Sequence, residues 1–409
     1  MNRIALAALA LTATGVPVLA GTDPWSNIDR DFAKLASSLT SAGPSGVTVT
    51  GFLRTSYMRS DETKAWTDTD TGGGNETLAG ADVGGFSIDD ARLVFTGTVG
   101  RFGLTIEIDG TNAQNDLAAD VNDNETNEST VVSSDLGVYG QTSTASTLGV
   151  LDAYATWNFT DQIRAQVGSF RAPFLASAMV NENDMLFLDR SILGTSWADR
   201  DEGVLLTGNM PMGHNASWGF ALSAQNGTDT SGKEVSSTAR LHMSLMNAGW
   251  TEGAVGAANS PALSVGISYF DDDGASQFNA IGYDAKFTFG QLAVSAEMVA
   301  YNDGIGVTVP DEQEPVTGNT GSLLLAGESP YAGTVSFRID NPQTNKPMAE
   351  LALRYEDLDD ADTSTVITYG ANWYFDGHAS KVQINYSKAE SDDEARDMDI
   401  LQVGLTVSI

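Results

Sequence analysis

The stretch from Glu350 to Glu356 reads ELALRYE, and its alternation of polar and apolar residues decides the fold class. Successive side chains of an extended strand point to opposite faces. One face of this stretch is apolar and carries Leu351, Leu353 and Tyr355. The other face is charged and carries Glu350, Arg354 and Glu356. Such alternation predicts a β-strand that separates an apolar environment from water.

The same period of two continues from Val47 to the C-terminus and predicts an all-β protein of about sixteen antiparallel strands. Most of these strands have the ~9–11 residues that a tilted membrane-spanning strand needs. The predicted strands are 47–57, 86–98, 102–109, 150–159, 163–170, 203–210, 217–224, 238–247, 262–270, 279–289, 291–301, 331–340, 349–357, 364–375, 379–389 and 399–409.

The connections between these strands alternate in length. The short ones are 99–101, 160–162, 211–216, Gly290 and 376–378, whereas the long ones are 58–85, 110–149, 171–202 and 302–330. Short turns at one rim and long loops at the other are typical of a transmembrane β-barrel. The connections 248–261 and 341–348 are longer than short turns usually are, which leaves the strand count open by two.

The apolar side of the strands predicts a lipid-facing wall. Because Arg or Lys at the membrane midplane costs about 2–4 kcal/mol, we expect no charge on that side of any strand. Strand-end aromatic residues on the same side predict interfacial girdles: Tyr57, Trp157, Phe159, Tyr269, Tyr355, Trp373 and Phe375. The last strand ends at Ile409 with its apolar face intact, as closure of a barrel requires. The alternative is a soluble β-sandwich, whose strands alternate in the same way.

The N-terminus predicts export. Residues 1–20 have the basic, apolar and small-residue regions of a cleaved secretory signal peptide. Residues 21–46 are expected to form a periplasmic segment with a short helix over 25–39, and residues 47–409 the barrel domain. The helix is interpreted as a stub at the periplasmic rim in preference to a trimer-stabilising coiled coil or a contact with another part of the envelope.

Composition excludes several classes of function. The chain has 54 Asp plus Glu against 21 Lys plus Arg, a net charge of −33, and would be repelled by nucleic acids. Without Cys it has no disulfide, thiolate nucleophile or zinc-thiolate site, and its three His are far apart in sequence. No apolar run after the N-terminus is long enough for a membrane-spanning helix. No set of residues in the sequence forms a recognisable catalytic motif, so we predict no enzymatic activity and no cofactor.

Four pieces of sequence carry a family resemblance: ARLVFTG at 91–97, VGSFRAPF at 167–174, LDRS at 188–191 followed by RDEGV at 200–204, and ELALRY at 350–355 leading to GANWYF at 370–375. In order and spacing they resemble the phosphate-selective porin O and P family over 47–409. The resemblance implies a homotrimeric porin of the Gram-negative outer membrane, in contact with its lipid and lipopolysaccharide. It also implies that the loop 171–202 folds into the lumen as a constriction.

The polar side of the strands supplies the candidate pore-lining residues. Eight are basic: Arg54, Arg92, Arg164, Arg240, Lys286, Arg338, Arg354 and Lys381. Nine are acidic: Asp90, Glu107, Asp109, Asp152, Asp284, Glu297, Asp340, Glu350 and Glu356. The candidate constriction loop adds both signs: Arg171, Glu182, Asp184, Asp189, Arg190, Asp199, Arg200, Asp201 and Glu202. We interpret each lumenal Arg as paired with a nearby carboxylate in preference to a dedicated anion site.

The predicted function is passive diffusion of ions and small polar solutes, with weak or cation-leaning selectivity. No dense Lys cluster of the kind associated with phosphate selectivity is present, so a phosphate- or anion-selective porin is the alternative. An alternative of another class is a soluble acidic calcium-binding surface or adhesion protein.

Two further motifs resemble ligand sites only in part. Asp68, Asp70 and Gly72 begin a loop like a calcium site, but Glu76 is out of register, so structural Ca²⁺ in the acidic loops is a lesser possibility. Residues 227–234 nearly form a phosphate-binding loop, but Glu234 replaces its final Ser or Thr.

Overall fold

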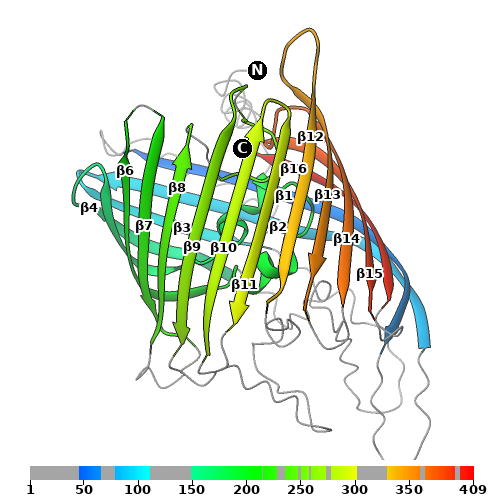
Figure 1. Cartoon of the computed structure of the whole chain (residues 1–409), viewed down its shortest axis with the longest axis horizontal. Helices are drawn as coiled ribbons and strands as arrows, with labels where there is room; N and C mark the ends of the chain where they lie inside the picture. Colours follow the sequence, from blue (N-terminus) through cyan, green and yellow to red (C-terminus); the bar gives the residue numbers. More distant parts are fainter. Residues whose placement is uncertain are drawn as a thin grey trace, which may run out of the picture. The chain divides into compact units, whose positions relative to one another are not determined.

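The protein forms a closed antiparallel barrel of sixteen strands (Figure 1). The computed structural model describes residues 46–65, 79–110, 149–213, 215–227, 235–246, 250–257, 259–272, 278–301, 329–359, 364–391 and 397–409. The predicted all-β barrel and its strand number are confirmed. The predicted signal peptide, the helix at 25–39 and the calcium-like loop lie outside the described residues. In the described part of the chain, no helix is long and apolar enough to cross a membrane.

Each strand pairs with its neighbours in sequence, and β1 pairs with β16 to close the barrel. The strands are β1 (Val47–Ala65), β2 (Ala79–Val99), β3 (Phe102–Asp109), β4 (Gly149–Asn158), β5 (Ile163–Arg171), β6 (Arg200–Pro211), β7 (Ala216–Gln225), β8 (Ser236–Leu245), β9 (Ala262–Asp272), β10 (Phe278–Phe289), β11 (Leu292–Tyr301), β12 (Tyr331–Asp340), β13 (Pro347–Asp357), β14 (Thr365–Tyr374), β15 (Ser380–Glu390) and β16 (Met398–Ser408).

Closure of the barrel uses the last residue of the chain. The backbone N–H of Ile409 donates to the carbonyl oxygen of Gly51 at 2.8 Å, and the N–H of Gly51 donates back to Ile409 at 3.3 Å. Along the seam, Leu53 lies opposite Val407 and Tyr57 lies opposite Val403. The two edge strands therefore satisfy one another's backbone groups, as hydrocarbon surroundings require.

The outer face of the barrel is apolar. Large apolar side chains are exposed on every side of the wall, for example Leu104 on β3, Leu241 on β8 and Leu351 on β13. Among the predicted girdle residues, Trp373 is 50% and Phe375 is 66% exposed. Exposed apolar side chains all round a closed sheet are those of a lipid-facing wall.

The expectation that no charge lies on the lipid-facing side is wrong at one rim. Lys388 and Glu390 point outward from β15 and form an exposed ion pair, and Asp399 of β16 lies opposite Lys388. These residues stand where β15 and β16 meet a long connection. Water and lipid headgroups reach the ends of the strands, so charge is tolerated there and not at the midplane.

The connection between β5 and β6 folds inside the barrel. This inner loop, residues 172–199, contains the short helices α3 (Ala176–Met179), η4 (Glu182–Asp184) and α4 (Ile192–Ser196). Its aromatic residues pack on the inner wall: the rings of Phe174 and Trp197 stack at 3.8 Å, and Trp197 contacts Phe270 edge-on at 4.9 Å. Phe270 and Val299 face the lumen and are buried in this core. The inner loop spans slightly narrower bounds than the predicted loop 171–202.

Candidate functional site

The descending arm of the inner loop is held by polar groups of the wall. The carbonyl oxygen of Phe174 accepts from the guanidinium of Arg240 on β8 at 2.7 Å and from Ser268 on β9 at 2.6 Å. The backbone N–H of Ser177 donates to Glu297 on β11 at 2.9 Å. Arg240 is in turn paired with Asp284 on β10 at 2.5 Å. Charged hydrogen bonds of this kind are stronger than neutral ones, so the arm is fixed to β8–β11.

The tip of the loop is held by β14 and β15. Lys381 donates to the carbonyl oxygen of Met185. The carbonyl oxygen of Leu186 accepts from Gln383 at 3.0 Å and from Asn372 at 2.8 Å. Lys381 and Gln383 are both fully buried, so the tip excludes water from this part of the wall.

The ascending arm is held by β13 and β16. Arg354 donates to the carbonyl oxygen of Asp189 at 3.0 Å, and Gln402 donates to the Asp189 carboxylate at 2.7 Å. Glu356 accepts from the backbone N–H of Ile192 at 2.6 Å and pairs with Arg354 at 2.7 Å. These wall charges bind the loop and are not free to line an open pore.

On the opposite side of the loop, Glu182 lies at the centre of an arginine cluster. Its carboxylate contacts Arg92 of β2 at 2.6 Å and Arg190 of the loop at 3.1 Å, and it also pairs with Arg171. Burial alone would raise the pKa of Glu182, but Arg171, Arg92, Arg190 and Arg200 together hold it below its ordinary value. Glu182 therefore stays ionised below its ordinary titration range, surrounded by cations.

A second layer of carboxylates compensates the arginines. Asp90 contacts Arg92 at 2.6 Å and Arg54 at 2.7 Å, while Glu107 contacts Arg92 at 3.0 Å. The cluster as a whole consists of five arginines and five carboxylates: Arg54, Arg92, Arg171, Arg190, Arg200, Asp90, Glu107, Asp109, Asp152 and Glu182. Its formal charge is therefore zero, and it presents opposite signs side by side.

The structure brings most of the predicted lumenal charges together and leaves a few apart. Arg200 pairs with Asp152 at 2.7 Å, and Arg338 pairs with Asp340 at 2.8 Å. Arg164 is exposed and forms no ion pair with a described residue.

The remaining carboxylates of the predicted constriction also form no ion pair with a described residue: Asp184, Asp199, Asp201 and Glu202. Burial raises the pKa of Asp184 and of Asp199 above the ordinary range, against the nearby charges of Lys381 and Arg200 respectively. Burial likewise raises the pKa of Asp189. Asp201 instead accepts the backbone N–H of Gly227 at 2.6 Å.

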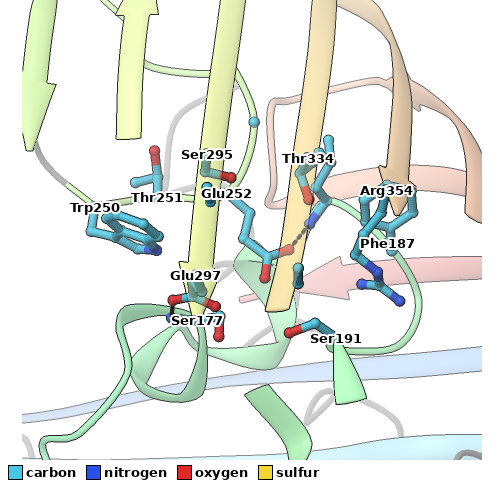
Figure 2. A pocket seen from close by; sticks show the side chains of 14 residues that line it. Ser177, Phe187, Ser191, Trp250, Thr251, Glu252, Ser295, Glu297, Thr334 and Arg354 are labelled. Carbon is cyan, nitrogen blue, oxygen red and sulfur yellow. Dashed lines mark hydrogen bonds between the residues drawn. The ribbon is translucent and has the colours of Figure 1, made fainter. Parts of the chain in front are cut away.

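A second segment also lies in the lumen and is absent from the predicted site. Residues 250–257, in the connection from β8 to β9, contact the wall through Lys286 and Glu350. Figure 2 shows Trp250, Thr251 and Glu252 beside Glu297 and Ser177 of the pocket between this segment and the inner loop. The unusual length of this connection was the sequence signal that could have predicted a second lumenal segment.

The described residues show no group of three or more His, Cys, Asp or Glu side chains that could hold a metal ion. The lumenal carboxylates are instead engaged by arginines and by backbone N–H groups. The geometry is that of a passage narrowed by a fixed loop, with paired charges of both signs at its side.

Comparisons with known proteins agree with this geometry. The sequence profile of a family described as phosphate-selective porin O and P matches residues 66–269 and 321–409. None of the curated proteins compared matches the sequence.

Three solved structures with the same fold are distant in sequence. The anion-selective porin from Comamonas acidovorans is 13% identical with a TM-score of 0.54, covering 89% of this chain and 100% of its own. Pseudomonas putida OprB, solved at high pH, is 9% identical with a TM-score of 0.50, covering 95% and 98%. A loop L8 deletion mutant of Vibrio cholerae OmpT is 10% identical with a TM-score of 0.50, covering 89% and 99%.

Proposed function

The chain belongs to the phosphate-selective porin O and P family, whose barrel fold is that of an outer-membrane channel. We propose that the protein has no enzymatic activity and that its water-filled lumen passes ions and small polar solutes passively, with weak or cation-leaning selectivity. The observation that carries the selectivity is the zero formal charge of the cluster around Glu182. The sign of the charge at a constriction governs which ions pass. A balanced cluster favours neither sign strongly.

Apart from Arg164, the remaining wall cations support the same proposal, because they are engaged by other groups of the protein. Arg240, Arg338 and Arg354 each pair with a carboxylate within 2.8 Å. Lys286 and Lys381 donate to backbone carbonyl oxygens of the inner segments. A cation that is buried against such partners has little field left for a passing anion.

The test is the reversal potential of the purified protein in a planar bilayer under a KCl gradient, repeated with added phosphate. We expect a reversal potential near zero or of the cation-selective sign, and no block by phosphate. Clear anion selectivity with phosphate block would contradict the proposal.

The alternative function is a phosphate- or anion-selective channel. The family's description favours it, and so do the four arginines that surround one carboxylate at Glu182 and the exposed Arg164, which pairs with no carboxylate of the described residues. Phosphate block of the current, removed by Arg164→Gln, would support this alternative.

We also propose a homotrimer in the outer membrane, delivered by a signal peptide cleaved after Ala20 and in contact with lipopolysaccharide. Family membership supports these proposals. Cross-linking in native membranes and N-terminal sequencing of the mature protein test them. The soluble calcium-binding alternative has no support in a closed barrel with an exposed apolar wall.

A further inference from the structure

The segment 250–257 enters the lumen from the rim that carries the short turns. It is tied to three wall strands: Lys286 of β10 donates to the Thr251 hydroxyl at 3.0 Å, and Glu350 of β13 accepts from the backbone N–H of Ala254 at 2.6 Å. Arg338 of β12 donates to the carbonyl oxygen of Ala254. Each of these wall residues is at most 8% exposed, so the segment is packed on the wall.

The same segment meets the tip of the inner loop. Glu252 accepts from the backbone N–H of Leu186 at 2.7 Å. Gly253 lies against both the Leu186 side chain and the Glu350 carboxylate, so closely that an added Cβ would approach them to 2.9 and 2.6 Å. The left-handed backbone at Gly253, with φ of 71°, further restricts this position to glycine.

Little open space remains between the two inner segments. The pocket they enclose with β11–β13 has a volume of about 30 Å³ and is lined by Glu252, Glu297 and Ser177, among others (Figure 2). That is room for about one or two water molecules. A hydrated ion therefore has no room to pass between the two inner segments at this pocket.

Water instead reaches the lumen at β4–β6. The lumen-facing residues Thr368 on β14 and Thr406 on β16 are 2% and 0% exposed. By contrast, Thr156 on β4 and Thr207 on β6 are partly exposed, and Arg164 on β5 is exposed. The Asp152 side chain is also 20% exposed.

We infer that residues 250–257 are a second constriction element. Together with the inner loop, this segment confines conduction to the lumenal face of β4–β6. Asp152, Arg164 and Arg200 on that face determine the ion preference of the channel. This inference rests on the proposed channel function. The two segments close the lumen from opposite rims, and their junction at Glu252 and Leu186 seals the β10–β16 side.

Cysteine accessibility tests the location of the path, since the natural chain has no Cys. Thr156→Cys and Thr368→Cys form a matched pair, because both residues face the lumen on opposite sides. A small charged methanethiosulfonate applied to the conducting channel is expected to reduce the current of Thr156→Cys. Its reaction at Thr368→Cys should be slower by on the order of 100-fold, because an enclosed thiol is inaccessible.

The outcomes separate the inference from the proposed function. A wild-type protein that inserts but does not conduct would refute the channel function itself. A conducting wild type in which Thr368→Cys reacts as fast as Thr156→Cys, or in which Thr156→Cys does not react, would refute the one-sided path.

Two further variants test the constriction and the residues assigned to ion preference. Replacing residues 251–256 by two glycines is expected to raise single-channel conductance about 1.5-fold or more, because it widens the lumen; shortening the turn 342–345 is the control and should not. Arg164→Glu is expected to shift the reversal potential towards cations, whereas Lys346→Glu, exposed on the turn between β12 and β13, should leave it unchanged. Unchanged conductance after the glycine replacement, or equal shifts in the two charge variants, would overturn the assignment.

Discussion

Glu182 is the residue on which the charge balance of the lumen depends. Three arginines pair with it directly, and they come from β2, from the end of β5 and from the inner loop. Four arginines lie close enough to attract its carboxylate. Their combined attraction outweighs the cost of burying the charge, which is why the pKa of Glu182 is lowered. The carboxylate thereby joins the loop to the wall.

Removing this charge should both destabilise the loop and change selectivity. Glu182→Gln leaves buried arginines uncompensated, which costs about 3–5 kcal/mol when a buried pair is broken. We expect a lower unfolding temperature, by heat-modifiable migration in detergent gels, and a reversal potential shifted towards anions. Glu390→Gln, which removes a carboxylate from the exposed ion pair at the rim of β15, is the control; an equal shift there would contradict the role of Glu182.

Acidification should titrate the loop carboxylates in a fixed order. Burial raises the pKa of Asp184 and Asp199, so they protonate above about pH 4, their ordinary range. Glu182 has a lowered pKa, so the stability it contributes is present above about pH 4.5 and is lost only as pH falls through its lower folded pKa.

We therefore expect selectivity to move towards anions on mild acidification while the loop stays in place. The measurement is the reversal potential against pH, in wild type and in the double variant Asp184→Asn with Asp199→Asn. An equally large shift in the double variant would show that other groups are responsible.

At the scale of elements, the approach of β5 to β4 requires a glycine. Gly168 has φ of 135°, and an added Cβ would lie 2.1 Å from the backbone oxygen of Ala153. Neither the backbone conformation nor the neighbouring strand allows a side chain there. The glycine thus sets the position of the strand that leads into the inner loop.

Gly168→Ala should impair assembly of the barrel far more than a comparable change elsewhere. We expect loss of the heat-modifiable form, because strain in the left-handed region adds to a backbone clash. Gly333→Ala on β12, where nothing lies within 4 Å of the added Cβ, should be close to neutral. Equal yields of folded barrel from the two variants would rule out this explanation.

The sequence was sufficient to predict the strands of the wall, but not the segments that fill the lumen. Alternation such as that of Leu351, Leu353 and Tyr355 follows directly from a sheet with two different faces. The alternation identifies a residue such as Lys381 as lumenal. It does not predict that Lys381 binds the carbonyl oxygen of Met185, about 200 residues earlier in the chain. Contacts between the barrel wall and an irregular loop leave no periodic pattern in the sequence. Phe270 and Val299, apolar on the polar side, were the visible sign that something covers the inner wall.

For the whole molecule, the outer wall must remain uncharged across its middle. Leu353→Arg, near the centre of β13, should destabilise the inserted barrel by about 2–4 kcal/mol. Lys388→Gln, at the rim of β15, should change stability little, because its ion pair with Glu390 is exposed. Denaturant unfolding in detergent or lipid measures both, and tolerance of Leu353→Arg would contradict the lipid-facing assignment.

The way the inner loop is tied to the wall also dictates an order of assembly. Its carbonyl oxygens and N–H groups are bound by side chains of β8, β11 and β13–β16, and Arg54 of β1 donates to the carbonyl oxygen of Leu188 at 2.7 Å. The loop has its full set of partners only in the closed barrel, in which β1 pairs with β16. We therefore expect the loop to be fastened completely, and the bore to reach its final width, only when the barrel has closed.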